Sequence, residues 1–254
     1  MNVLKRRISH LSVAVFAAAA LCASALTGCG SDTKAPESTE ASPTSAAPET
    51  SPTSVAQVDQ LMADSSEVMK TLRAVHVNLV VTNLQLQMET VDADVTNEPK
   101  GQGRAVGSAT IRMAPDADPV PMDFVIQNKT TYTKGPDGRY TARAPEDKIY
   151  RPGVVLSPDK GLGNIIANVK NPKTGEPETI AGVRTVRVTG TVDAAVVNAV
   201  IPGLGDSGEL PVTLWIAEGT PANLVKMDVT KDPGNVVVTL SKWGEPVTIP
   251  NTEG

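Results

Sequence analysis

Short stretches in which apolar and polar side chains alternate dominate the chain after residue 76. Gly, Pro and Asn separate these stretches, so they predict consecutive antiparallel strands, about ten or eleven in all. A sheet with that many strands curls instead of staying flat. The clearest stretches are residues 77–81, 91–95, 107–113, 122–126, 183–189, 212–217, 224–231 and 235–242.

Three segments show the 3.6-residue spacing of helices instead. Residues 55–74 are apolar on one face, and Ser54 with Gln57 fits a capping box at their start. The tripeptide at 157–159, Ser-Pro-Asp, is typical of a helix start, and a short third helix is predicted at 193–200. The apolar faces consist of Val58, Leu61, Met62, Met69 and Leu72 in the first helix and of Leu162, Ile165, Ile166 and Val169 in the second.

Gly161 and Gly163 fall in the second helical segment, where each glycine lowers helix stability by up to about 1 kcal/mol. They either permit close packing or give mobility near an opening. A turn at 171–175 then leads back to strands. Helices on the concave side of a single large antiparallel sheet give an α+β half-barrel with one covered face. We predict this fold for residues 55–254.

The N-terminal residues have the order of an export signal. Three basic residues at 5–7 precede an uncharged apolar run, and Leu26-Thr27-Gly28 then precedes Cys29. The tetrapeptide Leu26 to Cys29 looks like a bacterial lipobox, which implies cleavage before Cys29 and a diacylglyceryl group on its sulfur. An ordinary secretory signal with a chance cysteine is the alternative.

The segment that follows is rich in Pro, Ser and Thr and has no apolar period, which is typical of a disordered tether. We therefore expect a signal peptide at 1–28, a lipidated tether at 29–54 and a domain at 55–254. The chain would be held at the extracytoplasmic face of the cell membrane by its own fatty acids, without a spanning helix.

Composition argues against several classes of function. Without residues 1–28 the chain keeps 20 Lys and Arg against 28 Asp and Glu, a net charge of −8, which gives no electrostatic reason to bind nucleic acid. Beyond the signal, His76 is the only histidine and Cys29 the only cysteine. Zinc sites and nucleophilic triads need more of these residues. We therefore expect no catalytic residues, no metal and no cofactor, and we interpret Asp92 and Asp94 as solubilising residues on an outer strand face.

Aromatic residues are few: the chain has two Trp, three Tyr and two Phe. Small side chains instead fill the inward faces of the predicted strands, and they either pack compactly or leave a void between layers. A void would suit a ligand the size of a lipid. The candidate lining residues are Val91, Ala93, Val95, Gly107, Ala109, Ile111, Met113, Phe124, Ile126, Ile165 and Ile166. The alternative for each of them is a place in an ordinary core.

Several segments together resemble the mycobacterial LppX/LprA/LprF/LprG lipoproteins. They are residues 162–168, 211–216 and 238–244. Residues 91–97 and 103–107 are most similar to the LprF branch. The resemblance implies a curved sheet like that of the carriers LolA and LolB, with an apolar cavity for acylated glycolipids or triacylglycerol. It also implies that residues 107–113 form a cavity-lining strand, which makes Ala109 the first candidate.

Two functions remain open from the sequence. One is a monomeric, membrane-anchored lipoprotein that binds acylated lipids and helps move them across the envelope, and the resemblance implies phosphatidylinositol mannosides, lipoglycans or triacylglycerols as those lipids. The other is an interaction module that modulates a membrane sensor or transporter. An enzyme is the least favoured class, because the sequence offers no matched set of catalytic groups.

Overall fold

The computed structural model describes residues 55–114, 116–143 and 150–252. The predicted signal peptide, Cys29, the tether and the Ser54 cap lie outside the described residues.

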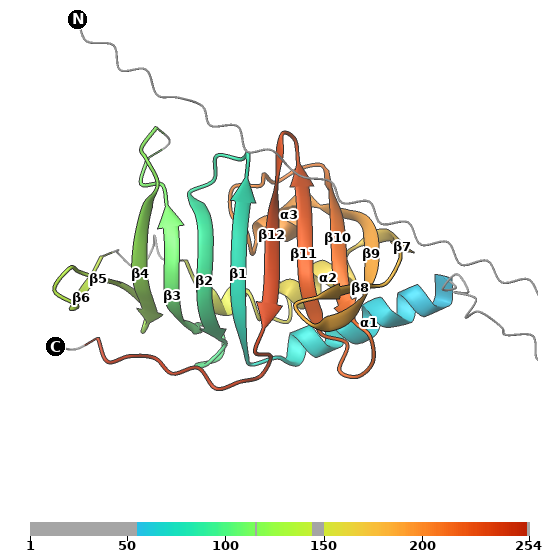
Figure 1. Cartoon of the computed structure of the whole chain (residues 1–254), viewed down its shortest axis with the longest axis horizontal. Helices are drawn as coiled ribbons and strands as arrows, with labels where there is room; N and C mark the ends of the chain where they lie inside the picture. The colour runs from blue at the N-terminus through green and yellow to red at the C-terminus, as the bar shows by residue number, and fades with distance from the viewer. Residues whose placement is uncertain (1–54, 115, 144–149, 253–254) are drawn as a thin grey trace, which may run out of the picture. The chain divides into compact units, whose positions relative to one another are not determined.

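Twelve strands of the described part form one antiparallel sheet that is not closed into a barrel (Figure 1). The strand order is β6-β5-β4-β3-β2-β1-β12-β11-β10-β9-β7, and β8 pairs with β9. The strands are β1 (Ala74–Thr82), β2 (Met88–Thr96), β3 (Arg104–Ile111), β4 (Val120–Gln127), β5 (Thr130–Lys134), β6 (Tyr140–Ala142), β7 (Lys170–Thr174), β8 (Glu178–Ile180), β9 (Val183–Asp193), β10 (Glu209–Ala217), β11 (Leu224–Lys231) and β12 (Gly234–Ser241). The large antiparallel sheet expected from the alternation is therefore confirmed.

The first and last strands meet in the middle of the sheet. Val77 of β1 lies opposite Leu240 of β12 on one side and Ala93 of β2 on the other. Strands β1 to β6 extend from this seam in one direction, and β12 back to β7 extend in the other (Figure 1). Each half is built mainly from sequential neighbours, which short connections favour.

The helices are α1 (Val55–Thr71), α2 (Leu162–Ala167) and α3 (Ala194–Asn198), with a 3₁₀ turn η2 (Pro152–Val154). Val58, Met62 and Met69 of α1 are buried, as its spacing predicted. None of the helices in the described part of the chain combines the length and the apolar character that crossing a membrane requires.

The α-helices cover only one half of the inner face. Figure 1 shows them behind the strands from β12 to β7, and their apolar residues share one buried cluster with those strands. Within that cluster Leu214, Met227 and Val236 are fully inaccessible to solvent. On the other half, η2 contacts β2 and β3, and no α-helix of the described chain covers β3 to β6. The inner face of the sheet is therefore covered by α-helices on one half and not on the other.

Two local expectations were wrong. The predicted turn at 171–175 is mostly the edge strand β7, in which Lys173 lies opposite Thr189. Pro172 is compatible with that strand because an edge strand need not donate every N–H. The second helix begins at Leu162 and not at the 157–159 tripeptide, which forms a turn closed by the Gly161 N–H donating to the Ser157 carbonyl at 2.8 Å.

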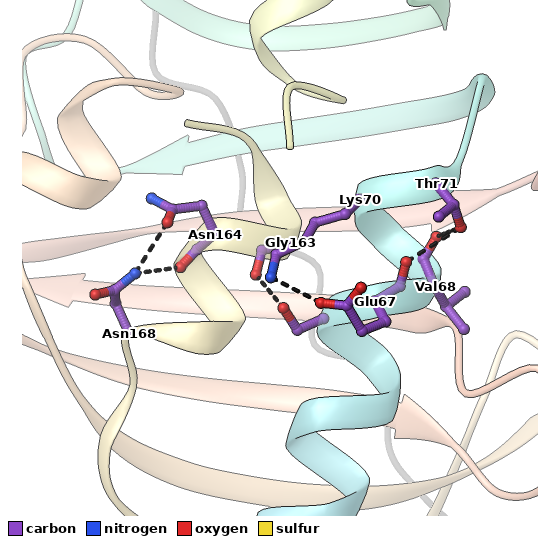
Figure 2. A network of polar contacts seen from close by, with 8 residues as sticks. Glu67, Val68, Lys70, Thr71, Gly163, Asn164 and Asn168 are labelled. Carbon is purple, nitrogen blue, oxygen red and sulfur yellow. Dashed lines mark hydrogen bonds and ion pairs between the residues drawn. The ribbon is translucent and has the colours of Figure 1, made fainter. Parts of the chain in front are cut away.

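Helices α1 and α2 pack closely through Gly163. A Cβ atom at residue 163 would lie 2.8 Å from the Ser66 carbonyl oxygen and 2.8 Å from Cγ of Lys70. The buried Ser66 hydroxyl donates to the Gly163 carbonyl at 2.8 Å. Figure 2 shows Gly163 facing the turn of α1 that carries Glu67 and Lys70, which pair at 2.9 Å. Of the two interpretations of this glycine, the structure supports close packing.

Replacing Gly163 with alanine should lower the free energy of unfolding by about 1–3 kcal/mol, because the added methyl group forces α1 and α2 apart. Urea unfolding gives this change through the midpoint. Ser66→Ala removes the hydrogen bond without adding volume and should cost about 1 kcal/mol. A Gly163→Ala chain more stable than the wild type, as an uncrowded helix would be, would show that the contact is loose.

Candidate functional site

A cavity of about 770 Å³ lies against the inner face of the uncovered half of the sheet. Strands β1 to β5 and β12 form one wall, and the segment around η2, the start of α2 and the residues after α3 form the other. Most of the lining is apolar, and this is the surface that acyl chains prefer. The sheet wall includes Val77, Leu79, Met88, Val91, Ala93, Val95, Ala105, Ala109, Ile111, Met113, Val120, Pro121, Met122, Phe124, Ile126 and Val238.

Eight of the eleven residues proposed from the sequence lie in this wall. They are Val91, Ala93, Val95, Ala109, Ile111, Met113, Phe124 and Ile126. The structure therefore brings these residues together around one space. Their contact with a lipid remains a prediction.

Gly107, Ile165 and Ile166 do not line the cavity. Ile165 and Ile166 have exposed fractions of 0% and 1%, because α2 turns them into the core under the covered half. Gly107 lies opposite Ala93. A Cβ atom at Gly107 would come within 2.6 Å of the Ala93 Cα. This glycine thus serves the close approach of β3 to β2.

Small side chains make the room on the sheet side. Across β2 and β3, Val95 faces Ala105, and Val91 faces Ala109. Together with Ala93 these residues point inward, whereas Ser108, the neighbour of Ala109, is exposed on the outer face. Of the two alternatives for a chain poor in aromatic residues, compact packing applies to the covered half and a void to the uncovered half.

The cavity meets solvent at the β3–β4 end of the sheet. Met113 and Val120 line it and yet are 63% and 47% exposed. The charged residues among the described lining are Lys134 and Arg143, both exposed. The Arg143 Nε donates to the Thr133 hydroxyl at 2.8 Å. The space is thus apolar inside and cationic at part of its rim.

The acidic pair lies outside this site, on the opposite face of β2. The Asp94 carboxylate lies 2.7 Å from the His76 Nδ1 and accepts a hydrogen bond when that nitrogen carries the proton, and Lys242 approaches the same carboxylate at 3.6 Å. Asn78 donates to Asp92 at 3.0 Å. The described residues include no group of three or more His, Cys, Asp or Glu side chains arranged to hold a metal ion.

Sequence reasoning missed the wall opposite the sheet. It consists of Tyr150, Pro152, Val155, Leu162, Val200 and Ile201. Most of these residues lie in turns and at helix ends, where apolar residues follow no period and give no signal. Tyr150 offered a weak one, as one of seven aromatic residues in the whole chain.

The Tyr150 hydroxyl is held in place inside the molecule. It donates to the Val200 carbonyl at 2.8 Å, and burial raises the pKa of the phenol above its ordinary value. A charged phenolate would lose hydration in this position. Tyr150 therefore stays a neutral donor, fixed between η2 and the segment after α3.

The raised pKa of Tyr150 should make stability fall in alkali. Below about pH 10 both the folded and the unfolded chain keep the proton. Above that pH the unfolded chain loses the proton first. The free energy of unfolding therefore falls by up to about 1.4 kcal/mol per pH unit because of this group. Tyr150→Phe should show a shallower decline in urea unfolding between pH 9 and pH 11. Parallel declines in the two proteins would place the hydroxyl in water.

Comparison with known proteins shows to which family this chain belongs. The sequence profile of a family described as LppX_LprAFG lipoprotein matches residues 57–249. The chain belongs to the LppX_LprAFG family. Its resemblance to these lipoproteins, seen from short segments, is therefore confirmed.

Two relatives within the family match nearly the whole chain. A Mycobacterium bovis protein named "Putative diacylated glycolipid transporter LprF" is 46% identical over 258 residues, which cover 98% of this chain and 95% of the relative. A second protein of that species, named "Lipoarabinomannan carrier protein LprG", is 29% identical over 240 residues, 93% of each chain.

Solved structures of family members have the same fold. The crystal structure of LprF from Mycobacterium bovis matches with a TM-score of 0.76 at 48% identity and covers 80% of this chain and 100% of that one. The crystal structure of Mycobacterium tuberculosis LppX matches with a TM-score of 0.57 at 24% identity, covering 78% and 100% of the two chains. The latter likeness concerns the fold alone.

Proposed function

We propose that this family member is an envelope lipoprotein that binds an acylated lipid, such as a glycolipid or triacylglycerol, and helps move it across the cell envelope. The observation that carries the proposal is the apolar cavity of about 770 Å³ under the uncovered half of the sheet. The names of LprF and LprG, a glycolipid transporter and a lipoarabinomannan carrier, support the same class of cargo.

The physical reason is the apolar surface that an acyl chain brings out of water. Each 100 Å² of apolar area buried stabilises the complex by about 2.5 kcal/mol. Ala93, Ala105 and Ala109 offer an inward wall without polar side-chain atoms, so a chain lying there leaves no hydrogen bond unmade. Apolar binding of this kind depends on the size of the acyl chain more than on its exact chemical structure.

The polar head of such a lipid would remain at the exposed rim. Lys134 and Arg143 provide cationic groups there, and the half-buried Thr131 provides a hydroxyl. Met113 and Val120 lie at the β3–β4 end of the cavity, where an acyl chain would pass between cavity and solvent. This division of apolar interior and polar rim suits an amphiphile better than a wholly apolar molecule.

The proposal includes attachment through Cys29 at the extracytoplasmic face of the membrane. Two or three acyl chains on that residue would hold the protein stably, whereas a single chain binds only marginally. The anchor would keep the cavity near the bilayer from which lipid is taken.

Ala109→Trp should abolish lipid uptake, because an indole in the middle of the sheet wall occupies the space of the acyl chains. We expect at least about a tenfold loss in extraction of radiolabelled glycolipid from vesicles, with an unchanged circular dichroism spectrum. Ser108→Trp is the matched control, since it places the same ring on the outer face and should extract lipid as the wild type does. Equal extraction by all three proteins would remove the cavity from the function.

Cys29→Ser should release the protein from the membrane fraction, because the sulfur that carries the diacylglyceryl group is lost. Immunoblots of membrane and soluble fractions of the expressing cell measure the change. A Cys29→Ser protein that has lost residues 1–28 and still sediments wholly with the membrane after a salt wash would refute anchoring through this residue.

A further inference from the structure

A second cavity, of about 430 Å³, adjoins the first. We call it the side chamber. The two cavities share five lining residues, which are Leu79, Gln87, Met88, Tyr150 and Ile201. The same side chains therefore face both spaces and form the partition between them.

The side chamber is also apolar. Besides the shared residues, it is lined by Val81, Leu86, Val154, Ala199, Pro202 and Arg151. Leu86 and Ile201 are 8% and 2% exposed, so its deeper wall belongs to the core, while Ala199 and Pro202 lie at its exposed edge. Arg151 is the charged residue of this wall and is exposed. Like the main cavity, the side chamber joins an apolar wall to a cationic rim.

Tyr150 is a fixed part of the partition. Tyr150 lines both cavities, and its hydroxyl donates to the Val200 carbonyl at 2.8 Å. Val200 itself lines the main cavity. Because the hydrogen bond ties Tyr150 to the segment that follows α3, the ring has one defined position, and an amphiphile that uses both spaces must place a chain on each side of it.

The volumes decide how many chains each space can hold. A methylene group is about the size of a water molecule, which takes about 30 Å³, so the main cavity has room for about 26 such groups and the side chamber for about 14. One palmitoyl chain, with about 16 carbons, fits in the main cavity, but two chains, with about 32, exceed it. Both spaces together hold about 40 groups, which is enough for two chains when the second chain places about 14 of its roughly 16 carbons in the side chamber and the carbons next to the head group outside it.

We infer that the side chamber is a second acyl-chain site, and that a diacyl lipid divides its two chains between the main cavity and the side chamber, on either side of Tyr150. This inference rests on the proposed function, because it concerns the same cargo. It makes the partition a determinant of specificity: lipids with one chain need the main cavity alone, whereas lipids with two chains need both.

The experiment fills the side chamber from either wall. Val81→Trp acts from β1 and Ala199→Trp from the end of α3, and neither residue lines the main cavity. Val80→Trp is the matched control, because Val80 adjoins Val81 but is 40% exposed on the opposite face of β1. The probes are dipalmitoylglycerol and monopalmitoylglycerol, and native mass spectrometry of the Cys29→Ser chain gives the bound fraction without counting an attached anchor.

Both chamber variants should bind dipalmitoylglycerol about tenfold more weakly than the wild type and monopalmitoylglycerol within about twofold of it. Val80→Trp should bind both lipids as the wild type does. Retained monopalmitoylglycerol binding also reports that the variant is folded. If Val81→Trp does not fold, Ala199→Trp, at an exposed edge, decides alone.

Two results would overturn the inference: undiminished binding of dipalmitoylglycerol by the folded variants, or an equal loss of both lipids. Either would leave the proposed function standing, since the wild type would still bind lipid. A wild-type chain that binds neither probe is the distinct result that counts against the proposed function itself.

Discussion

The sheet of this protein is wider than the helices that cover it, and its other features follow from that mismatch. Three α-helices bury the inner face from β9 to β12, where side chains such as Leu214 and Met227 are fully inaccessible to solvent. Strands β3 to β5 lie beyond the reach of those helices. Because β1 pairs with both β12 and β2, the two halves are one continuous sheet, and the packed half supports the open half.

The contact between α1 and α2 keeps the helices on their own half. Gly163 lets the helix axes approach, and the Ser66 hydroxyl satisfies a buried carbonyl at the crossing. A larger residue there would displace α2, whose first residue, Leu162, lies at the border between core and cavity. Stability and cavity shape therefore depend on the same contact. A bound lipid would add to the stability of such a chain by mass action, by about 2.7 kcal/mol at a hundred times its dissociation constant.

The sequence was a good guide to the sheet and a poor guide to the second wall of the cavity. Alternation predicts which residues of a strand share a face, and it therefore placed Val91, Ala93 and Ala109 on the inner side, where the structure has them. Alternation does not indicate where helices stop covering that face. Ile165 and Ile166, apolar and helical in spacing, were assigned to the cavity, yet they belong to the core, since a core position and a cavity position have the same pattern.

Residues such as Tyr150 and Ile201 were out of reach for a different reason. They come from turns and helix ends, whose apolar residues have no period, and only tertiary structure brings them opposite the strands. The edge strand β7 was hidden in a similar way, because Pro172 and a polar composition indicated a turn. Both cases show that pattern is informative where an element repeats and uninformative where the chain changes direction.

The central claim is that acyl chains occupy the cavity under the uncovered half of the sheet. A crystal structure of the protein purified from its own cell envelope would show it. We predict continuous electron density for acyl chains within about 4 Å of Ala93, Ala105 and Ala109. Ordered water throughout that space, or a cavity collapsed onto its own side chains, would contradict it.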